Sequence, residues 1–273
     1  LQALSDSQSY PGSISTFVVP ADHAWTAIAP PITHLPGITT ARASDETIAA
    51  VAEQLRGAQH SALFLGGRAL RAEALYQAGR IAAATGCRLV TETFFARQAR
   101  GIGRVVTERL AYFGEMAVEQ LAGLDTLVLV GAKAPFSFFA YPDKPSVLSP
   151  DTADLSTLVD VRIDALDALT RLADLLDAPA QPVTASAQAA HPLTDGKIDA
   201  TELGKVVANR LPEQAIVCDE GATNSLGTFL LPANAAAHDW LTLTGGSIGQ
   251  GLPLAVGAAF ACPNSPSIAL EAE

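Results

Sequence analysis

The amino-acid sequence predicts an α/β protein built around a doubly wound, Rossmann-like parallel sheet. Short apolar runs typical of buried strands alternate with helical patterns between residues 44 and 176, and a second such pattern starts near residue 198. Parallel strands need crossover connections, so this alternation favours a sheet covered by helices on both faces. With 273 residues, of which 49% are hydrophobic and 16% charged, the chain can bury a sizeable core.

The composition excludes several classes of protein. A formal net charge of −11 opposes binding to nucleic acids and anionic membranes. No signal-peptide pattern is present, and no apolar run reaches the ~20 residues of a membrane span. The three widely spaced cysteines fit buried free thiols, and the five histidines fit surface or capping positions. These features predict a soluble cytoplasmic protein.

The N-terminal region predicts one strand followed by a linker. Residues 14–19 form a β-branched and aromatic run that stops at Pro20, and residues 26–43 are a proline-containing linker without periodicity. A lone strand needs neighbours, so we expect further sequence before Leu1.

The central segment, residues 44–176, predicts the doubly wound domain. The expected helices are 45–55, 69–85 and 116–121, and the expected strands are 62–65, 87–90 and 126–130.

A second α/β unit, residues 198–273, follows a linker at 177–197 that is rich in Ala, Pro, Ser and Gln. Its expected helices are 200–210, one starting near 222, and 252–261; its expected strands are 215–218, 240–243 and 267–270.

Two turns of the central domain are candidate nucleotide contacts. Gly66, Gly67 and Arg68 join a strand to a helix, where glycines admit a ligand and backbone N–H groups face a phosphate. Lys133 follows the strand 126–130, at the edge where such sheets bind ligands. Each has a plain alternative: Gly66, Gly67 and Arg68 could form a tight turn between strand and helix, and Lys133 could be a solvated lysine on a loop. Four nearby aromatic residues could form the floor of a flavin or adenine site, but we expect them in the core. They are Phe136, Phe138, Phe139 and Tyr141.

The glycine-rich segment 243–259, LTGGSIGQGLPLAVGAA, is the most informative. Four glycines in seven residues leave a loop with few side chains, followed by an apolar helix with Pro253 in its first turn. Ile248 stands alone there as a large apolar residue, which indicates packing against a specific partner.

This segment resembles the start of the diphosphate-binding domain in thiamine-diphosphate-dependent enzymes of the acetolactate synthase and benzoylformate decarboxylase family. Residues 218–225, CDEGATNS, resemble the strand-to-helix turn near the cofactor diphosphate, and residues 12–25, GSISTFVVPADHAW, resemble the last strand of the pyrimidine-binding domain. The resemblance implies the end of a pyrimidine domain at 1–25, a middle domain at 44–176, and the first part of the diphosphate-binding domain at 198–273.

The resemblance also implies roles for single residues. Ile248 would prop the cofactor in its bent shape, and the Gly246 carbonyl would meet the pyrimidine amino group. Ala222 and Thr223 would lie at the diphosphate. Gly245 and Ser247 complete the cofactor-contacting loop.

A metal and further partners follow from the same resemblance. Mg²⁺ would bridge the diphosphate, with Glu273 at the position of the family's aspartate. The substrate would be a 2-keto acid, and the enzyme a lyase or transferase assembled as a homodimer or homotetramer. The catalytic glutamate would precede Leu1, so we expect no catalytic residue in this chain and no activity from it alone. FAD could occupy the middle domain.

Other functions remain open. The middle domain could be a module that binds FAD or ADP, or a purely structural unit. A dehydrogenase would need a fuller glycine fingerprint than Gly66 and Gly67 provide. The residues do not choose between decarboxylation and carboligation.

Overall fold

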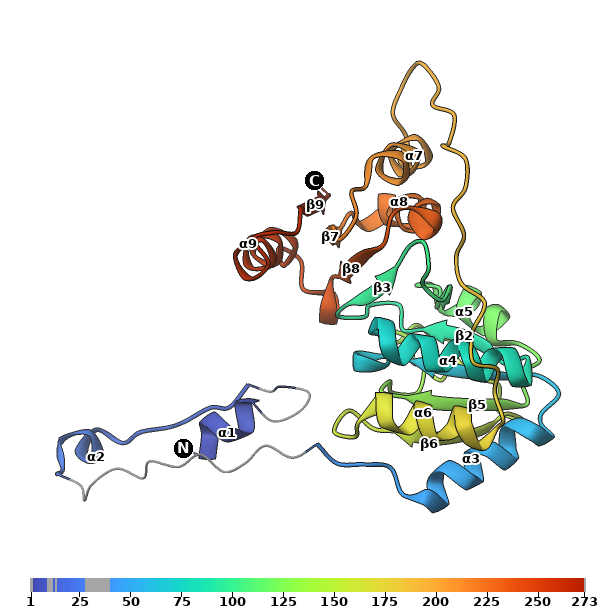
Figure 1. The fold of residues 1–273 in the computed structure, drawn as a ribbon. Coiled ribbons are helices and arrows are strands. Elements are labelled where there is room, and N and C mark those ends of the chain that lie inside the picture. Colours follow the sequence, from blue (N-terminus) through green and yellow to red (C-terminus); the bar gives the residue numbers. More distant parts are fainter. Residues whose placement is uncertain (1, 9–11, 13, 28–39, 273) are drawn as a thin grey trace.

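A computed structural model describes residues 2–8, 12, 14–27 and 40–272 of the chain. Two sheets, each with its own helices, are joined along one side, and an N-terminal arm extends away from them (Figure 1). Glu273, His34 and most of the linker predicted at 26–43 lie outside the described residues.

The central domain contains the predicted parallel sheet. Its five strands lie in the order β4-β2-β1-β5-β6, and every pairing is parallel. The strands are β1 (Ser61–Leu65), β2 (Arg88–Thr91), β4 (Glu108–Arg109), β5 (Thr126–Val130) and β6 (Asp154–Val159). β1 and β5 are buried at every position because helices cover both faces, as the sequence predicts.

Helices of this domain pack on both faces of the sheet. One core joins the sheet to α3 (Asp45–Gly57), α4 (Ala72–Thr85) and α6 (Ala165–Leu175), and a second core joins it to α5 (Gly114–Leu121). A short 3₁₀ helix, η1 (Gly67–Leu70), precedes α4. The carboxylate of Asp164 accepts hydrogen bonds from two N–H groups in the first turn of α6, and Ser44 does the same for one N–H of α3.

The second domain is built on a four-stranded sheet of order β3-β8-β7-β9. The strands are β3 (Gln98–Arg100), β7 (Ile216–Glu220), β8 (His238–Thr242) and β9 (Ser267–Glu271). β7, β8 and β9 are parallel and were expected from the sequence. β3 was not expected: it belongs to the central segment of the chain and pairs antiparallel with β8.

The helices of the second domain begin and end close to the predicted residues. They are α7 (Ala200–Arg210), α8 (Ser225–Leu230) and α9 (Gly251–Ala261), with the short turns η2 (Ala222–Asn224), η3 (Leu231–Asn234) and η4 (Thr244–Gly246).

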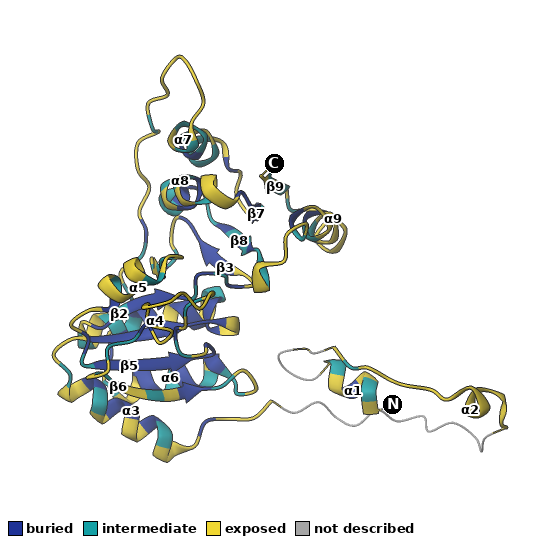
Figure 2. Cartoon of the chain, turned by 180° about the vertical axis from the view of Figure 1, so that it is seen from behind, coloured by how far each residue is buried: buried dark blue, intermediate teal, exposed yellow. Residues whose placement is uncertain are grey.

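The N-terminal arm departs from the prediction. The described residues 14–20 form no strand, and Ile14, Phe17 and Val18 are exposed (Figure 2). Only α1 (Gln2–Gln8) and α2 (Ala21–Trp25) are regular among the described residues of the arm. The predicted strand is wrong for this structure because no neighbouring strand in the described part of the chain satisfies its backbone groups.

Two further expectations are corrected. Cys87 and Cys218 are buried free thiols as expected, but Cys262 is exposed at the end of α9. His238 is buried rather than at the surface, because it lies on β8 opposite Arg100 of β3. Among the described helices, none has both the length and the apolar character needed to cross a membrane.

The two domains share one continuous core across β3. Ala99 of β3 belongs to the same cluster of buried side chains as Val217 and Trp240 of the second sheet. The buried guanidinium of Arg100 donates to the Phe229 carbonyl over 2.6 Å and lies 3.6 Å from the centroid of the Phe229 ring. The middle domain therefore supplies part of the second domain's interior.

His238 gives this interface a predicted pH dependence. Burial lowers the pKa of His238 to about 4, and the nearby positive charge of Arg100 adds to the effect. In the unfolded chain this imidazole takes up a proton near its ordinary pKa of 6.5, so stability falls as the pH drops from about 6.5 towards 4. Between pH 7 and pH 5, we expect wild type to lose about 2 kcal/mol more unfolding free energy than His238→Asn.

Urea titrations at the two pH values measure this difference, with His23→Asn in the exposed arm as the matched control. Equal pH dependence in wild type and His238→Asn would contradict the assignment.

Candidate functional site

The carboxyl ends of β7, β8 and β9 form the edge that carries the predicted cofactor residues. The chain passes from β7 to β8 on one side and then crosses to β9 on the other, so the order reverses at β7. Ligands of open α/β sheets bind outside the carboxyl ends at such a reversal. The turn 221–225 follows β7 and the glycine loop 243–250 follows β8, so both lie at this edge.

Asp219, near the end of β7, shapes the turn 221–225. Its buried carboxylate accepts hydrogen bonds from the Gly221 N–H over 3.0 Å and from the Ser225 hydroxyl over 2.6 Å. The indole N–H of Trp240 donates to the other carboxylate oxygen over 3.0 Å. Three donors around one acid fix the start of the turn that contains Ala222 and Thr223.

A cation from the middle domain balances the charge of Asp219. The guanidinium of Arg109 lies 4.0 Å from the Asp219 carboxylate and 4.8 Å from the centroid of the Phe229 ring. Burial lowers the pKa of Arg109, and the charge of Asp219 opposes that change. The turn is therefore tied electrostatically to the middle domain.

The turn itself is strained and open. Ala222 has φ of +45°, in the left-handed region that residues with a Cβ rarely adopt, while Ala222 and Thr223 are both exposed. Backbone strain of this kind clusters at functional sites, where surrounding contacts hold it in place. Here Asp219 provides those contacts.

The glycine loop presents Ile248 to solvent. Gly245, Gly246 and Gly249 have positive φ angles, a conformation that glycine adopts at little cost. Ile248 is 93% exposed between them, although it is a large aliphatic residue. A Cβ placed on Gly246 or Gly249 would meet no atom within 4 Å, so open space adjoins the loop.

Glu220, the last residue of β7, holds the far end of this loop. Its buried carboxylate accepts hydrogen bonds from the N–H of Gly249 and, over 2.5 Å, from the N–H of Gly251. Sequence reasoning placed Glu220 in a family-like motif but gave it no role. An acid directly after a buried strand and beside a glycine-rich loop was the available signal.

These features fit the cofactor implied by the resemblance. An exposed aliphatic side chain, an open glycine backbone and a hydroxyl-bearing turn share one sheet edge, and each can contact a different part of thiamine diphosphate. Among the described residues, no three His, Cys, Asp or Glu side chains gather closely enough to hold a metal. The predicted metal residue Glu273 lies outside that part of the chain.

The candidate nucleotide residues of the middle domain meet at a second sheet edge. Gly66 follows β1 and Gly131 follows β5, and a Cβ on Gly66 would lie 2.8 Å from the Gly131 carbonyl oxygen. A Cβ on Gly131 would likewise lie 2.8 Å from the Gly66 carbonyl oxygen. Close packing of the two turns by itself therefore requires glycine at both positions. Gly67, Arg68 and Lys133 lie beside them, with Gly67 and Lys133 exposed.

Glu92 also lies at this edge and was not anticipated. Its carboxylate would lie 2.5 Å from a Cβ on Gly66. Burial raises the pKa of Glu92 to about 7, with the Lys133 N–H and ammonium opposing the rise. This acid exchanges protons near neutral pH.

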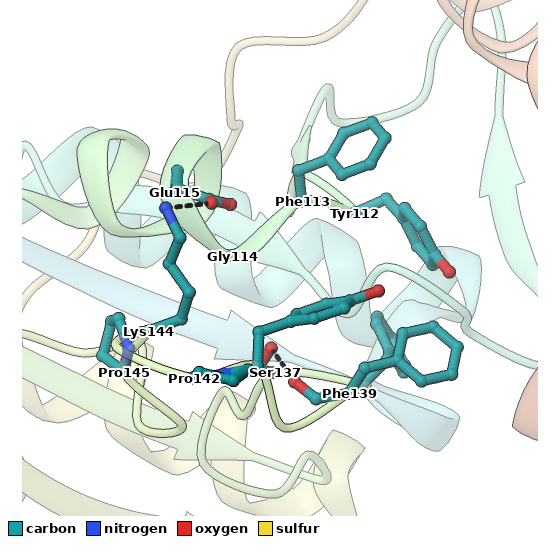
Figure 3. A pocket seen from close by; sticks show the side chains of 11 residues that line it. Tyr112, Phe113, Gly114, Glu115, Ser137, Phe139, Pro142, Lys144 and Pro145 are labelled. Carbon is teal, nitrogen blue, oxygen red and sulfur yellow. Dashed lines mark hydrogen bonds and ion pairs between the residues drawn. The ribbon is translucent and has the colours of Figure 1, made fainter.

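The aromatic residues after β5 lie at the surface, where Phe138, Phe139 and Tyr141 line a pocket, so their expected place in the core is corrected. Phe136, Phe138, Phe139 and Tyr141 are all exposed. A pocket of about 430 Å³ lies between this loop and residues 112–115, with the Lys144–Glu115 ion pair at its rim (Figure 3). The loop after β5 runs over the surface, so no second layer of the described chain covers these rings.

Comparison with known proteins relates the whole chain to one group of enzymes. The chain is 43% identical over 262 residues to the Mycobacterium tuberculosis protein named "Putative acetolactate synthase large subunit IlvX", an alignment that covers 95% of the chain and 50% of that protein. The chain is a homologue of acetolactate synthase large subunit-like proteins. It spans about half the length of this curated relative. No protein-family model matches it.

Solved structures show the corresponding fold. A Mycobacterium smegmatis protein described as a "putative thiamin diphosphate-dependent enzyme" superposes with a TM-score of 0.71 at 22% identity, covering 95% of this chain and 53% of that one. The thiamine diphosphate-dependent 4-hydroxybenzoylformate decarboxylase of Rhodococcus jostii RHA1 gives 0.67 at 23% identity, covering 90% and 50%. The α/β fold of this chain therefore corresponds to about half of each of these two solved structures.

Asp219→Asn tests the support of the turn. The amide places an NH2 donor at one of two oxygen positions, of which one accepts from Gly221 and Ser225 and the other from Trp240, and it leaves the largely buried Arg109 without its counter-ion. We expect a loss of about 3 kcal/mol in unfolding free energy and a shifted Trp240 fluorescence maximum. Asp195→Asn, in the exposed linker, is the control. An unchanged spectrum and stability would show that Asp219 does not hold the turn.

Glu92→Gln tests the acid at the second edge. The folded protein keeps the Glu92 proton up to a pKa of about 7, whereas the unfolded chain loses it near the ordinary glutamate pKa of 4.5. Wild-type stability therefore falls as the pH rises through this window. We expect Glu92→Gln to be about 2 kcal/mol more stable than wild type at pH 8 and close to it at pH 4.5 in urea titrations. Equal stability at pH 8, or the same gain from exposed Glu119→Gln, would contradict this account.

Proposed function

We propose that this acetolactate synthase-like chain belongs to an enzyme that uses thiamine diphosphate to make or break the C–C bond next to the keto group of a 2-keto acid. One observation carries the proposal: the loop that presents Ile248, 93% exposed, shares a sheet edge with the strained turn at Ala222 and Thr223. An aliphatic side chain held out on a glycine loop requires an apolar partner, and the thiazolium and pyrimidine rings of the cofactor are suitable partners.

Each residue of the proposed site has a task that its geometry allows. Ile248 would be the apolar support against which the rings of the cofactor are held. The Gly246 carbonyl accepts from the pyrimidine amino group, which open space at its Cα permits. The Thr223 hydroxyl and the backbone of Ala222 meet the diphosphate, while Gly245 and Ser247 complete the loop. When bound, the cofactor supplies a carbanion and an electron sink.

A metal ion and a second subunit complete the proposal. Mg²⁺, with oxygen ligands that include Glu273, would join the diphosphate to the protein. A homodimer or homotetramer is supported by α9, on which Leu252, Val256 and Phe260 are exposed, Phe260 at 90%. We expect the 273-residue chain alone to be inactive, since the resemblance places the catalytic glutamate in the pyrimidine domain. We propose either a lyase or a transferase. A decarboxylase among the similar folds supports the lyase, and the synthase-like relative supports the transferase.

A flavin in the middle domain is the second candidate. The pocket of about 430 Å³ lined by Tyr112, Phe113 and Phe139 offers ring faces to a planar ligand. Gly66, Gly67, Arg68 and Lys133 lie at the carboxyl edge of the same sheet, where a diphosphate would be held. If the domain binds FAD, we expect an absorbance band near 450 nm that remains with the protein after added FAD is removed by gel filtration. Absence of this band would leave the domain a structural unit.

Ile248→Ala in the protein at its natural length tests the main proposal. A smaller side chain lets the cofactor relax, so we expect turnover of a 2-keto acid at saturating thiamine diphosphate and Mg²⁺ to fall at least about tenfold. Cofactor affinity, measured by calorimetry, should change much less. Ile198→Ala, an exposed aliphatic outside the site, is the control. Failure of wild type to bind thiamine diphosphate would overturn the function, and full activity of Ile248→Ala would overturn the role of this residue.

A further inference from the structure

The glycine loop and the helix after it have little local support: one side-chain pair, Thr244 and Gln250, is hydrogen-bonded across the loop over 2.9 Å, and neither residue caps the helix. Three loop glycines adopt positive φ. Because glycine is conformationally permissive, fixing this loop in one conformation costs more entropy than fixing a loop of other residues. The helix α9 has no side-chain cap at Gln250 and no acid in its first turn. Its first N–H groups therefore need acceptors from elsewhere in the fold.

Glu220 supplies those acceptors from a distant part of the sequence. Its two carboxylate oxygens take the N–H groups of Gly249 and Gly251, one on each side of Gln250. The acid comes from the buried end of β7, which is paired with strands on both sides. Its negative charge also faces the positive end of the α9 dipole. A rigid strand thereby fixes a flexible loop through two charge-assisted hydrogen bonds.

The packing around Gly251 shows how closely the acid approaches. A Cβ at this position would lie 2.9 Å from Glu220 Oε2 and would collide with Glu271 Oε1. Gly257, further along α9, has no atom within 4 Å of the corresponding point. Glycine is therefore required at position 251 because the side chains of Glu220 and Glu271 both lie against the backbone there.

We propose that Glu220 is a positioning residue that holds the glycine loop in the conformation that presents Ile248 and the Gly246 carbonyl. This inference rests on the proposed function for its consequence, which is that Glu220 sets the affinity for thiamine diphosphate without touching the reacting atoms. Neutralising the acid releases the loop, and the cofactor then has to order it on binding.

Hydrogen exchange of the loop amides tests the hydrogen bonds without any cofactor. In protein labelled with ¹⁵N-glycine, Glu220→Gln is expected to raise the exchange rates of the Gly249 and Gly251 amides at least about tenfold. Glu213→Gln, which removes the same charge from an exposed position, should leave them unchanged. Unchanged exchange in Glu220→Gln would overturn the proposal, whatever happens to cofactor binding.

Cofactor titration of the same variants tests the consequence. In the protein at its natural length, we expect the thiamine diphosphate Kd of Glu220→Gln to rise at least about tenfold, with kcat at saturating cofactor within about twofold of wild type. A purely structural defect would raise the Kd, lower kcat and lower the melting temperature together. Faster amide exchange with an unchanged Kd would overturn the positioning role, whereas a wild type that binds no cofactor would refute the proposed function instead.

Gly251→Ala keeps the proposal testable if Glu220→Gln does not fold. Its Cβ separates the loop from the carboxylate, so the same rise in Kd and faster exchange at Gly249 are expected. Gly257→Ala adds the same methyl group to α9 in open space and should behave as wild type. Identical behaviour of the two alanine variants would contradict the role of Glu220.

Discussion

The hydrogen bonds that two adjacent carboxylates at the end of β7 accept are the interactions on which the proposed site depends. Asp219 points towards the turn 221–225, and Glu220 points towards the glycine loop. Both loops contain backbone conformations that need support from outside, because one includes a strained alanine and the other three left-handed glycines. The alternation of side chains along a strand directs the two acids to opposite sides, so a single buried strand organises both loops.

The middle domain takes part in this arrangement as a structural support. β3 extends the second sheet, the hydroxyl of Thr242 donates to the Phe95 carbonyl over 2.6 Å, and Arg109 balances the charge of Asp219. Thr242 is the last residue of β8, directly before the glycine loop. The middle domain therefore contacts the turn and the strand before the loop from one side. The core that the two domains share holds these contacts in place.

Local sequence patterns predicted most of the regular structure, whereas most residues of the candidate site were expected from the family resemblance. Continuous apolar runs such as residues 126–130 identify buried parallel strands, and the isolated Ile248 among glycines marks an exposed contact. Residues 98–100 gave no such signal, because a three-residue strand with Gln and Arg forms only through its pairing with β8. The predicted strand at 14–19 failed for the converse reason: its apolar pattern is strong, but the described chain offers no partner.

The roles of buried charged groups were the hardest to anticipate. Asp219, Glu220 and Arg109 are ordinary in sequence, and their importance follows from long-range packing that brings separate segments together. The aromatic residues after β5 were misplaced in the core, since composition alone does not reveal whether another layer covers them.

The most direct test of the account is a ¹⁵N-glycine NMR titration of the protein with thiamine diphosphate and Mg²⁺. The account predicts selective shifts of the Gly245, Gly246, Gly249 and Gly251 resonances, with Gly66, Gly67 and Gly131 unaffected. Shifts confined to the middle-domain glycines, or none at saturating cofactor, would contradict the claim that the loop after β8 forms the cofactor site.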